Sequence, residues 1–261
     1  MLRRIMFFGL ILVFAVGMST ARVFAVSEKD LEKQAENVAK LLVSCRAIIA
    51  ENQGLFNNPE IGDKGFTGDV YVAKVIEHFK KATGVEISEA DASSSDPVKK
   101  APGTLLVSTK SVIDESQTVL NTKDKGFKNV IPAIVGRRTG YKYNEAMGSD
   151  YYLKQTSLKY RNPANAPDAF EAKILKEFEA EDYPKGQGKG KVVDGSDGSK
   201  KYRYMLPLYI GAACLKCHGD PKGEKDIAGR IKEGYKEGEV RGAISVMIPY
   251  PSGSGDIAQA K

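Results

Sequence analysis

Two cysteines and a histidine stand close together in the C-terminal quarter of the chain, in the order Cys214-Leu215-Lys216-Cys217-His218. The C-x-x-C-H spacing is the attachment signature of a c-type haem. Two cysteines three residues apart can each add to one vinyl group of a porphyrin, and the adjacent imidazole can then reach the iron. The motif therefore predicts one covalently bound haem c, held through thioethers at Cys214 and Cys217, with His218 as the proximal iron ligand.

Two other uses of the cysteine pair have to be weighed against haem. One is a C-x-x-C disulfide or redox pair that happens to precede a histidine, but a thioredoxin-like motif belongs near a βαβ unit, which this segment lacks. The other is a structural zinc site, which is disfavoured because the pair has no partner pair at the usual spacing. The N-terminus also favours haem, since it indicates export and thioethers are made after export.

The first 25 residues have the three parts of a secretory signal peptide. Arg3 and Arg4 supply a positive charge, and the run IMFFGLILVFAV is too short for a comfortable transmembrane helix. A small-residue cleavage site follows, so we expect cleavage after Ala25. The mature protein would then be periplasmic or otherwise exported, with no membrane attachment. An uncleaved N-terminal anchor is the alternative.

Composition and charge limit the partners. The net charge is +6, and removal of the signal peptide takes away three arginines and no acidic residue, which leaves +3. No basic stripe with interleaved aromatic residues is present, so nucleic acid is not an expected partner. Apolar residues make up 42% of the chain and charged residues 28%, as in ordinary soluble domains. We expect one domain over 26–249, a disordered tail over 250–261, and a redox partner protein or a downstream signalling protein.

The hydrophobic pattern predicts an α+β fold, with helices first and an antiparallel set of strands later. Apolar spacing predicts helices over 27–50, 67–82 and 104–121, and another helix that begins at Pro167, is capped by Asn165 or Ala166 and runs to about Glu181. Strands are predicted over 129–140, 151–161, 201–210 and 240–249. The stretches 87–103 and 184–200 are rich in Gly, Ser, Lys, Asp and Pro and are predicted as loops, the second with a loose hairpin as its alternative.

The third cysteine, Cys45, lies on the apolar stripe of the helix predicted over 27–50. If the other two cysteines form thioethers, Cys45 has no disulfide partner, and a free thiol in an oxidising compartment is a liability unless it is buried or ligated. Haem iron can take a sixth ligand opposite His218. The candidates in the mature chain are Cys45, His78, Met147, Met205 and Met247. Each also has a plain structural interpretation, since cysteine and methionine commonly fill cores.

Three segments together resemble a known family. They are TSLKYRNPANAPDAFEAKILKEFE (156–179), KYRYMLPLYIGAACLKCHGDPKG (201–223) and GEVRGAISVMIP (238–249). They resemble exported single-haem proteins that carry c-type haem in a PAS-like domain with a His/Cys axial pair, and the resemblance runs over about residues 30–249. It implies haem attachment at Cys214 and Cys217, His218 as proximal ligand, and a cysteine of the N-terminal helix, here Cys45, as sixth ligand. It also implies a PAS-like antiparallel sheet, with the haem between sheet and N-terminal helices.

Ligation by Cys45 would have a clear consequence for the iron. A thiolate stabilises Fe(III) over Fe(II), so we expect a low reduction potential and a sixth bond that reduction or protonation can release. Propionate contacts are predicted from position alone. The candidates are Arg137, Arg138, Arg161 and Tyr202, and the alternative is that the arginines are ordinary surface or structural residues.

Electron transfer is the function that these features favour. The alternative is a redox or gas sensor for CO or NO that acts through a partner protein. A haem enzyme such as a peroxidase is disfavoured, because no distal histidine with a helper arginine is evident, and we expect no enzymatic activity.

Overall fold

The computed structural model describes residues 27–195 and 198–251. This part of the chain contains eight α-helices and one four-stranded antiparallel sheet, so the predicted α+β class is confirmed. The helices are α1 (Glu28–Glu51), α2 (Gln53–Phe56), α3 (Gly68–Thr83), α4 (Pro97–Asp114), α5 (Gln117–Leu120), α6 (Pro132–Met147), α7 (Ala169–Phe178) and α8 (Leu215–His218). Three short 3-10 helices accompany them: η1 (Glu89–Ser93), η2 (Pro163–Asn165) and η3 (Ala212–Cys214).

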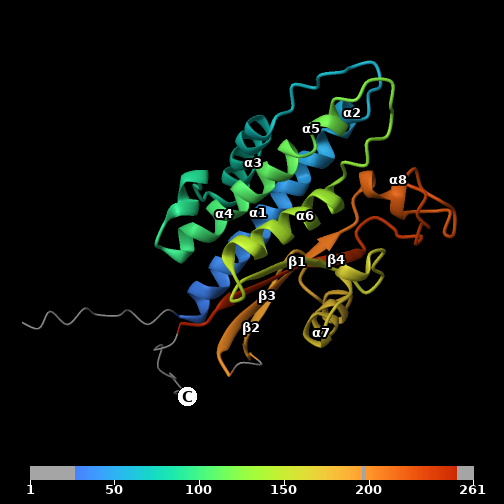
Figure 1. The fold of residues 1–261 in the computed structure, drawn as a ribbon. Coiled ribbons are helices and arrows are strands. Elements are labelled where there is room, and N and C mark those ends of the chain that lie inside the picture. The colour runs from blue at the N-terminus through green and yellow to red at the C-terminus, as the bar shows by residue number, and fades with distance from the viewer. Residues whose placement is uncertain (1–26, 196–197, 252–261) are drawn as a thin grey trace, which may run out of the picture.

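The sheet has the order β1-β4-β3-β2, and all of its neighbouring strands are antiparallel. The strands are β1 (Tyr152–Thr156), β2 (Lys189–Asp194), β3 (Lys200–Tyr209) and β4 (Val240–Pro249). Figure 1 shows α1 and α6 lying along one face of the sheet, with α3 and α4 stacked over them, and α7 on the opposite face. The molecule is therefore layered, and α1 and α6 separate the sheet from α3 and α4.

The strands predicted over 201–210 and 240–249 are confirmed as β3 and β4, and their side chains alternate between two cores. Leu206 of β3 and Ile244 of β4 are register partners and belong to the main core that α1 covers. Met205 and Ala243 point to the other face, where they pack against residues of α7. Successive strand residues point to opposite faces, so one pair of strands supplies both cores.

Local signals account for α1 and α3. Ser27 and Asp30 form a capping box at the start of α1, in which each side chain bonds the other's backbone N–H. Gly84 ends α3 in the left-handed conformation, with φ of 71°. That conformation is favourable for glycine because it lacks a Cβ atom. Both helices lie where the apolar spacing predicts them.

The strand predicted over 129–140 is wrong, because this segment forms the first half of α6. Pro132 occupies its first turn, where a missing N–H costs nothing. Val135, Thr139 and Tyr143 are buried at steps of four, which is helical spacing. A short apolar run does not by itself distinguish a strand from a buried helix, and here the continuation to Met147 decides for helix.

Other boundaries also differ from the prediction. Asp96 caps α4, which begins inside the predicted loop 87–103. Asp168 rather than Asn165 or Ala166 caps α7, and α7 ends at Phe178. The second predicted loop, 184–200, contains β2, which pairs with β3. The hairpin given as the alternative for this stretch is therefore the arrangement that the structure has.

The two ends of the sequence are largely outside the described residues. The predicted signal peptide, 1–25, lies entirely outside them, as does 252–261. Tyr250, at the start of the predicted tail, donates its N–H to the carbonyl of Lys200, so regular pairing extends to this residue. Across the described ranges, no helix has the length and apolar character needed to cross a bilayer.

Candidate functional site

The C-x-x-C-H motif forms a compact turn beyond the end of β3. Gly211 leads from the strand into η3, which ends at Cys214, and α8 then carries Cys217 and His218. Figure 1 places α8 outside the layered body, at the end of the sheet. Both cysteines are free thiols and only half-buried, so both side chains keep some exposure to solvent.

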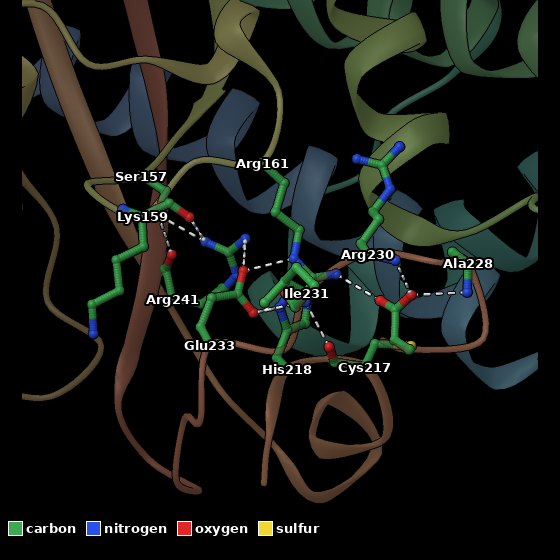
Figure 2. A network of polar contacts seen from close by, with 11 residues as sticks. Ser157, Lys159, Arg161, Cys217, His218, Ala228, Arg230, Ile231, Glu233 and Arg241 are labelled. Atoms are coloured by element: carbon green, nitrogen blue, oxygen red, sulfur yellow. Dashed lines mark hydrogen bonds and ion pairs between the residues drawn. The ribbon is translucent and has the colours of Figure 1, made fainter. Parts of the chain in front are cut away.

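His218 is held by a carboxylate. Its Nδ1 lies 2.8 Å from Oε2 of Glu233, and Figure 2 marks this contact with a dashed line. An ionised carboxylate can only accept, so Nδ1 carries the proton and Nε2 keeps its lone pair. Burial, followed by the charge of Arg241, lowers the pKa of His218. The imidazole is therefore neutral at pH 7 and able to bind a metal through Nε2.

Arg161 organises the loop that follows the motif. Its Nε and Nη2 donate to the two carboxylate oxygens of Glu233 at 2.6 and 2.7 Å, and its Nη1 donates to Asp226 at 2.7 Å. Nη2 also bonds the carbonyls of Cys217 and Ile231. This one guanidinium thus ties two carboxylates and the motif backbone together (Figure 2).

The ionised state of Glu233 follows from these contacts. Burial opposes ionisation of this carboxyl, but hydrogen bonds from Arg161 and His218 outweigh burial and leave its pKa below the ordinary value. Arg241 adds a cation 3.6 Å from Oε1. The group that faces the imidazole is therefore a fixed negative charge.

A cavity of about 130 Å³ opens beside His218, between the end of β1, the first turns of α6 and α1. Its volume corresponds to roughly four water molecules at about 30 Å³ each, which suits the acidic groups of a ligand rather than a whole porphyrin. Within the described chain, the lining residues include no Asp or Glu. They include five arginines, namely Arg46, Arg137, Arg161, Arg230 and Arg241.

The arginine cluster fits the two propionates of a haem. Nε of Arg137 is buried and has no hydrogen-bond partner, and such an atom costs free energy until it is paired. Burial, followed by repulsion from Arg241, lowers the pKa of Arg46 to about 10. Clustered guanidinium groups repel one another, so a pair of carboxylates would relieve both costs and accept bidentate bonds.

The structure separates the four residues predicted to contact propionates. Arg137 and Arg161 line the cavity. Arg138 points away and bonds Glu115 and Ser116 instead. Tyr202 lies buried in the main core, where burial raises its pKa. Of the four, therefore, Arg137 and Arg161 are positioned for the role, and Arg161 already bonds two carboxylates.

Sequence reasoning missed Arg46, Arg230, Arg241 and Glu233. Arg46 carried a signal, because it follows Cys45 on a helix that was expected to lie beside the haem. The other three are brought to the motif by the loop 219–235 and by β4. Nothing in their local sequence distinguishes them from the many surface charges of the chain.

Cys45 lies elsewhere. It is fully buried, and its neighbours are Thr109 of α4 and Tyr71 of α3, whose hydroxyl donates to the backbone carbonyl of Cys45 at 3.0 Å. Burial is the main cause that raises the pKa of Cys45 to about 12. Its side chain thus faces the helical layer.

All five candidates for a sixth ligand lie among the described residues, and none of them lines the cavity. His78 bonds Ser44, and Met205 packs beneath α7. His/Cys ligation therefore stays a prediction.

An α+β chain with a C-x-x-C-H turn beside an arginine-lined cavity has the features of a haem protein. The chain belongs to the Tll0287-like family (Tll0287), whose model matches residues 25–249. This is a family of c-type cytochromes, and membership indicates a haem cofactor. No curated protein and no solved structure matches the chain.

Proposed function

We propose that this protein is an exported c-type cytochrome that binds one haem and transfers electrons. The observation that carries the proposal is the position of His218. Its Nε2 is left free by the bond from Nδ1 to Glu233, and it lies beside two accessible thiols and a cavity lined by arginines. When bound, the haem supplies a one-electron Fe(III)/Fe(II) couple.

The chain's own residues divide the work of holding the cofactor. Cys214 and Cys217 would fix it covalently, and Nε2 of His218 would bind the iron. Arg137, with its unpaired Nε, and Arg241 would neutralise the propionates. Arg161 would keep the loop 219–235 closed against the motif through Glu233 and Asp226. The protein that we propose carries electrons and has no enzymatic activity of its own.

The test is the covalent haem itself. The full chain is produced in a host that exports it and matures c-type cytochromes, and its mass and pyridine haemochrome spectrum are measured. We expect the mass of the chain from Val26 onward plus one haem, with the spectrum of two thioether bonds. The double variant C214S/C217S should lose covalent haem, whereas C45S should keep it. A wild-type chain without covalent haem would overturn the proposal.

A second candidate function, a redox or gas sensor with a PAS-like domain, is favoured by the position of Cys45. The family resemblance implies that this thiol is the sixth ligand, yet here it is buried against Tyr71 and Thr109 in the helical layer, and burial raises its pKa. A bond to iron would require the thiol to lose its proton and these partners, so the bond would be conditional. Rapid CO binding by the reduced protein, with no CO binding by the oxidised protein, would support sensing. A reduced protein that excludes CO would support electron transfer.

A further inference from the structure

We propose that Glu233 is a positioning residue for the haem ligand His218. Its carboxylate fixes the tautomer and the ring orientation of the imidazole, and it lowers the reduction potential of the iron by increasing the donor strength of Nε2. The inference rests on the proposed function, and it assigns a role to a residue that no sequence motif singles out.

The hydrogen bond determines the tautomer. Glu233 Oε2 lies 2.8 Å from Nδ1 of His218, and an imidazole whose Nδ1 donates presents a lone pair at Nε2. A second contact limits the ring, since Tyr235 meets it edge-on with ring centroids 6.3 Å apart. The imidazole thus has a hydrogen bond and an aromatic contact that limit its orientation before any metal is bound.

Glu233 is itself immobilised. Two nitrogens of Arg161 bond its two oxygens in a bidentate pair, and Arg241 stands 3.6 Å from Oε1. Its side chain is 14% exposed, so water competes little for these oxygens. A carboxylate held in this way cannot rotate away from the imidazole without breaking the bidentate pair.

A carboxylate at this position acts on the metal as well as on the fold. A metal-bound imidazole that donates to a carboxylate gains partial imidazolate character, becomes a stronger donor and favours the more oxidised metal. The charge alone would have a smaller effect, because Arg161 and Arg241 screen it. Glu233 is therefore expected to lower the potential mainly through the hydrogen bond.

Asp226 provides a matched control in the same cluster. It bonds Nη1 of the same arginine and is 1% exposed, but no hydrogen bond joins it to His218. The substitution D226N removes one buried negative charge and can keep the backbone bonds that Oδ1 accepts from Ala228 and Arg230. E233Q removes the same charge and the carboxylate that bonds the imidazole.

The experiment measures the reduction potential and the ferric electron paramagnetic resonance spectrum of the haem-loaded full chain. We expect E233Q to raise the potential clearly more than D226N does and to widen the spread of g values, whereas D226N should leave the g values in place. The exposed residue Glu224, 61% exposed, supplies a surface control, and E224Q should change neither quantity. Equal potentials in E233Q and D226N, with unchanged g values, would overturn the proposal.

Haem content separates this proposal from the one on which it rests. Absence of covalent haem in the wild-type chain counts against the proposed function, whereas haem-loaded variants with equal potentials count against the role of Glu233 alone. Should E233Q fail to accumulate with haem, E233D takes its place, because it keeps the charge and shortens the side chain by one methylene. A raised potential in E233D supports the positioning role, and an unchanged potential overturns it.

Discussion

Cys45 and Arg46 are consecutive residues of α1, but their side chains lead to different parts of the molecule. Arg46 lines the cavity beside His218. Cys45 lies among Tyr71 and Thr109 in the helical layer. Consecutive helical residues point about 100° apart. The same turn of α1 can therefore direct one side chain to a cofactor site and the next into the hydrophobic core. The position of this helix next to the cavity is therefore consistent with a role at the haem, and the contribution of each of the two residues can be tested separately.

The first prediction concerns Cys45. If the family resemblance holds for ligation, ferric wild-type protein has the narrow low-spin g values of a thiolate ligand, and C45S loses them. The variant should fold, because Tyr71 and Thr109 offer hydrogen bonds to a hydroxyl in place of the thiol. The measurement is low-temperature electron paramagnetic resonance, with S44A as the neighbouring control. Spectra that are identical in wild type and C45S would restrict Cys45 to packing.

The second prediction compares two adjacent arginines. Arg137 lines the cavity with an unpaired Nε, whereas Arg138 bonds Glu115 at the surface. Reduction adds an electron to the haem, so loss of a nearby cation should disfavour it. We expect R137Q to lower the reduction potential by the equivalent of about 1 kcal/mol, and R138Q to leave it unchanged. Spectroelectrochemical titration of the two variants measures the difference, and equal shifts would contradict the assignment of Arg137 to the propionates.

The third prediction concerns the clamp formed by Arg161. Removal of one partner from a buried ion cluster leaves the other charges unpaired, which typically costs about 3–5 kcal/mol. R161M should therefore lower the free energy of unfolding strongly, as measured by urea denaturation of the haem protein. K232M is the control, because Lys232 lies 3.9 Å from the exposed Glu224, and such a pair is worth less than about 1 kcal/mol. A cost for R161M no larger than that of K232M would show that the loop is held by other contacts.

The fourth prediction concerns acid. Burial opposes ionisation of Asp226, but bonds from the backbone of Arg230 and from Arg161 leave its pKa below the ordinary 3.8. A carboxyl whose pKa is lower in the folded state than in the unfolded state stabilises the fold at pH values above its unfolded-state pKa. This stabilisation is lost as the pH falls through the folded-state pKa.

Wild-type stability should accordingly decrease as the pH drops below about 4, and D226N should decrease less steeply over the same interval. Urea unfolding at neutral pH and at several acidic values gives the two slopes. Parallel curves would mean that Asp226 does not contribute to the acid sensitivity.

The parts of the fold that follow from sequence are those with local causes. Ser27 with Asp30 begins α1, Gly84 ends α3, and the alternation in β3 and β4 marks two faces, and all of these follow from short-range physical chemistry. The first half of α6 was not predictable in this way, because an apolar run without its continuation fits a strand equally well.

The site shows the same limit at longer range. The motif is visible in the sequence, but Glu233 meets His218 only because the loop 219–235 folds back. Arg46 comes near Arg241 only because α1 packs on the face of the sheet that contains β4. Burial of Cys45 was predictable from its place on an apolar stripe. Which layer it faces depends on how α3 and α4 pack, which no spacing within α1 specifies.

The order of strands also bears on how the haem motif is assembled. β4 lies between β1 and β3 although it is the last strand in the sequence, so β1 has no partner, and β3 has only β2, until β4 joins the sheet. The haem motif lies in the connection between β3 and β4. Pairing of β3 with β4 therefore also closes the loop that carries Cys214, Cys217 and His218, so formation of the sheet and assembly of the motif are one event.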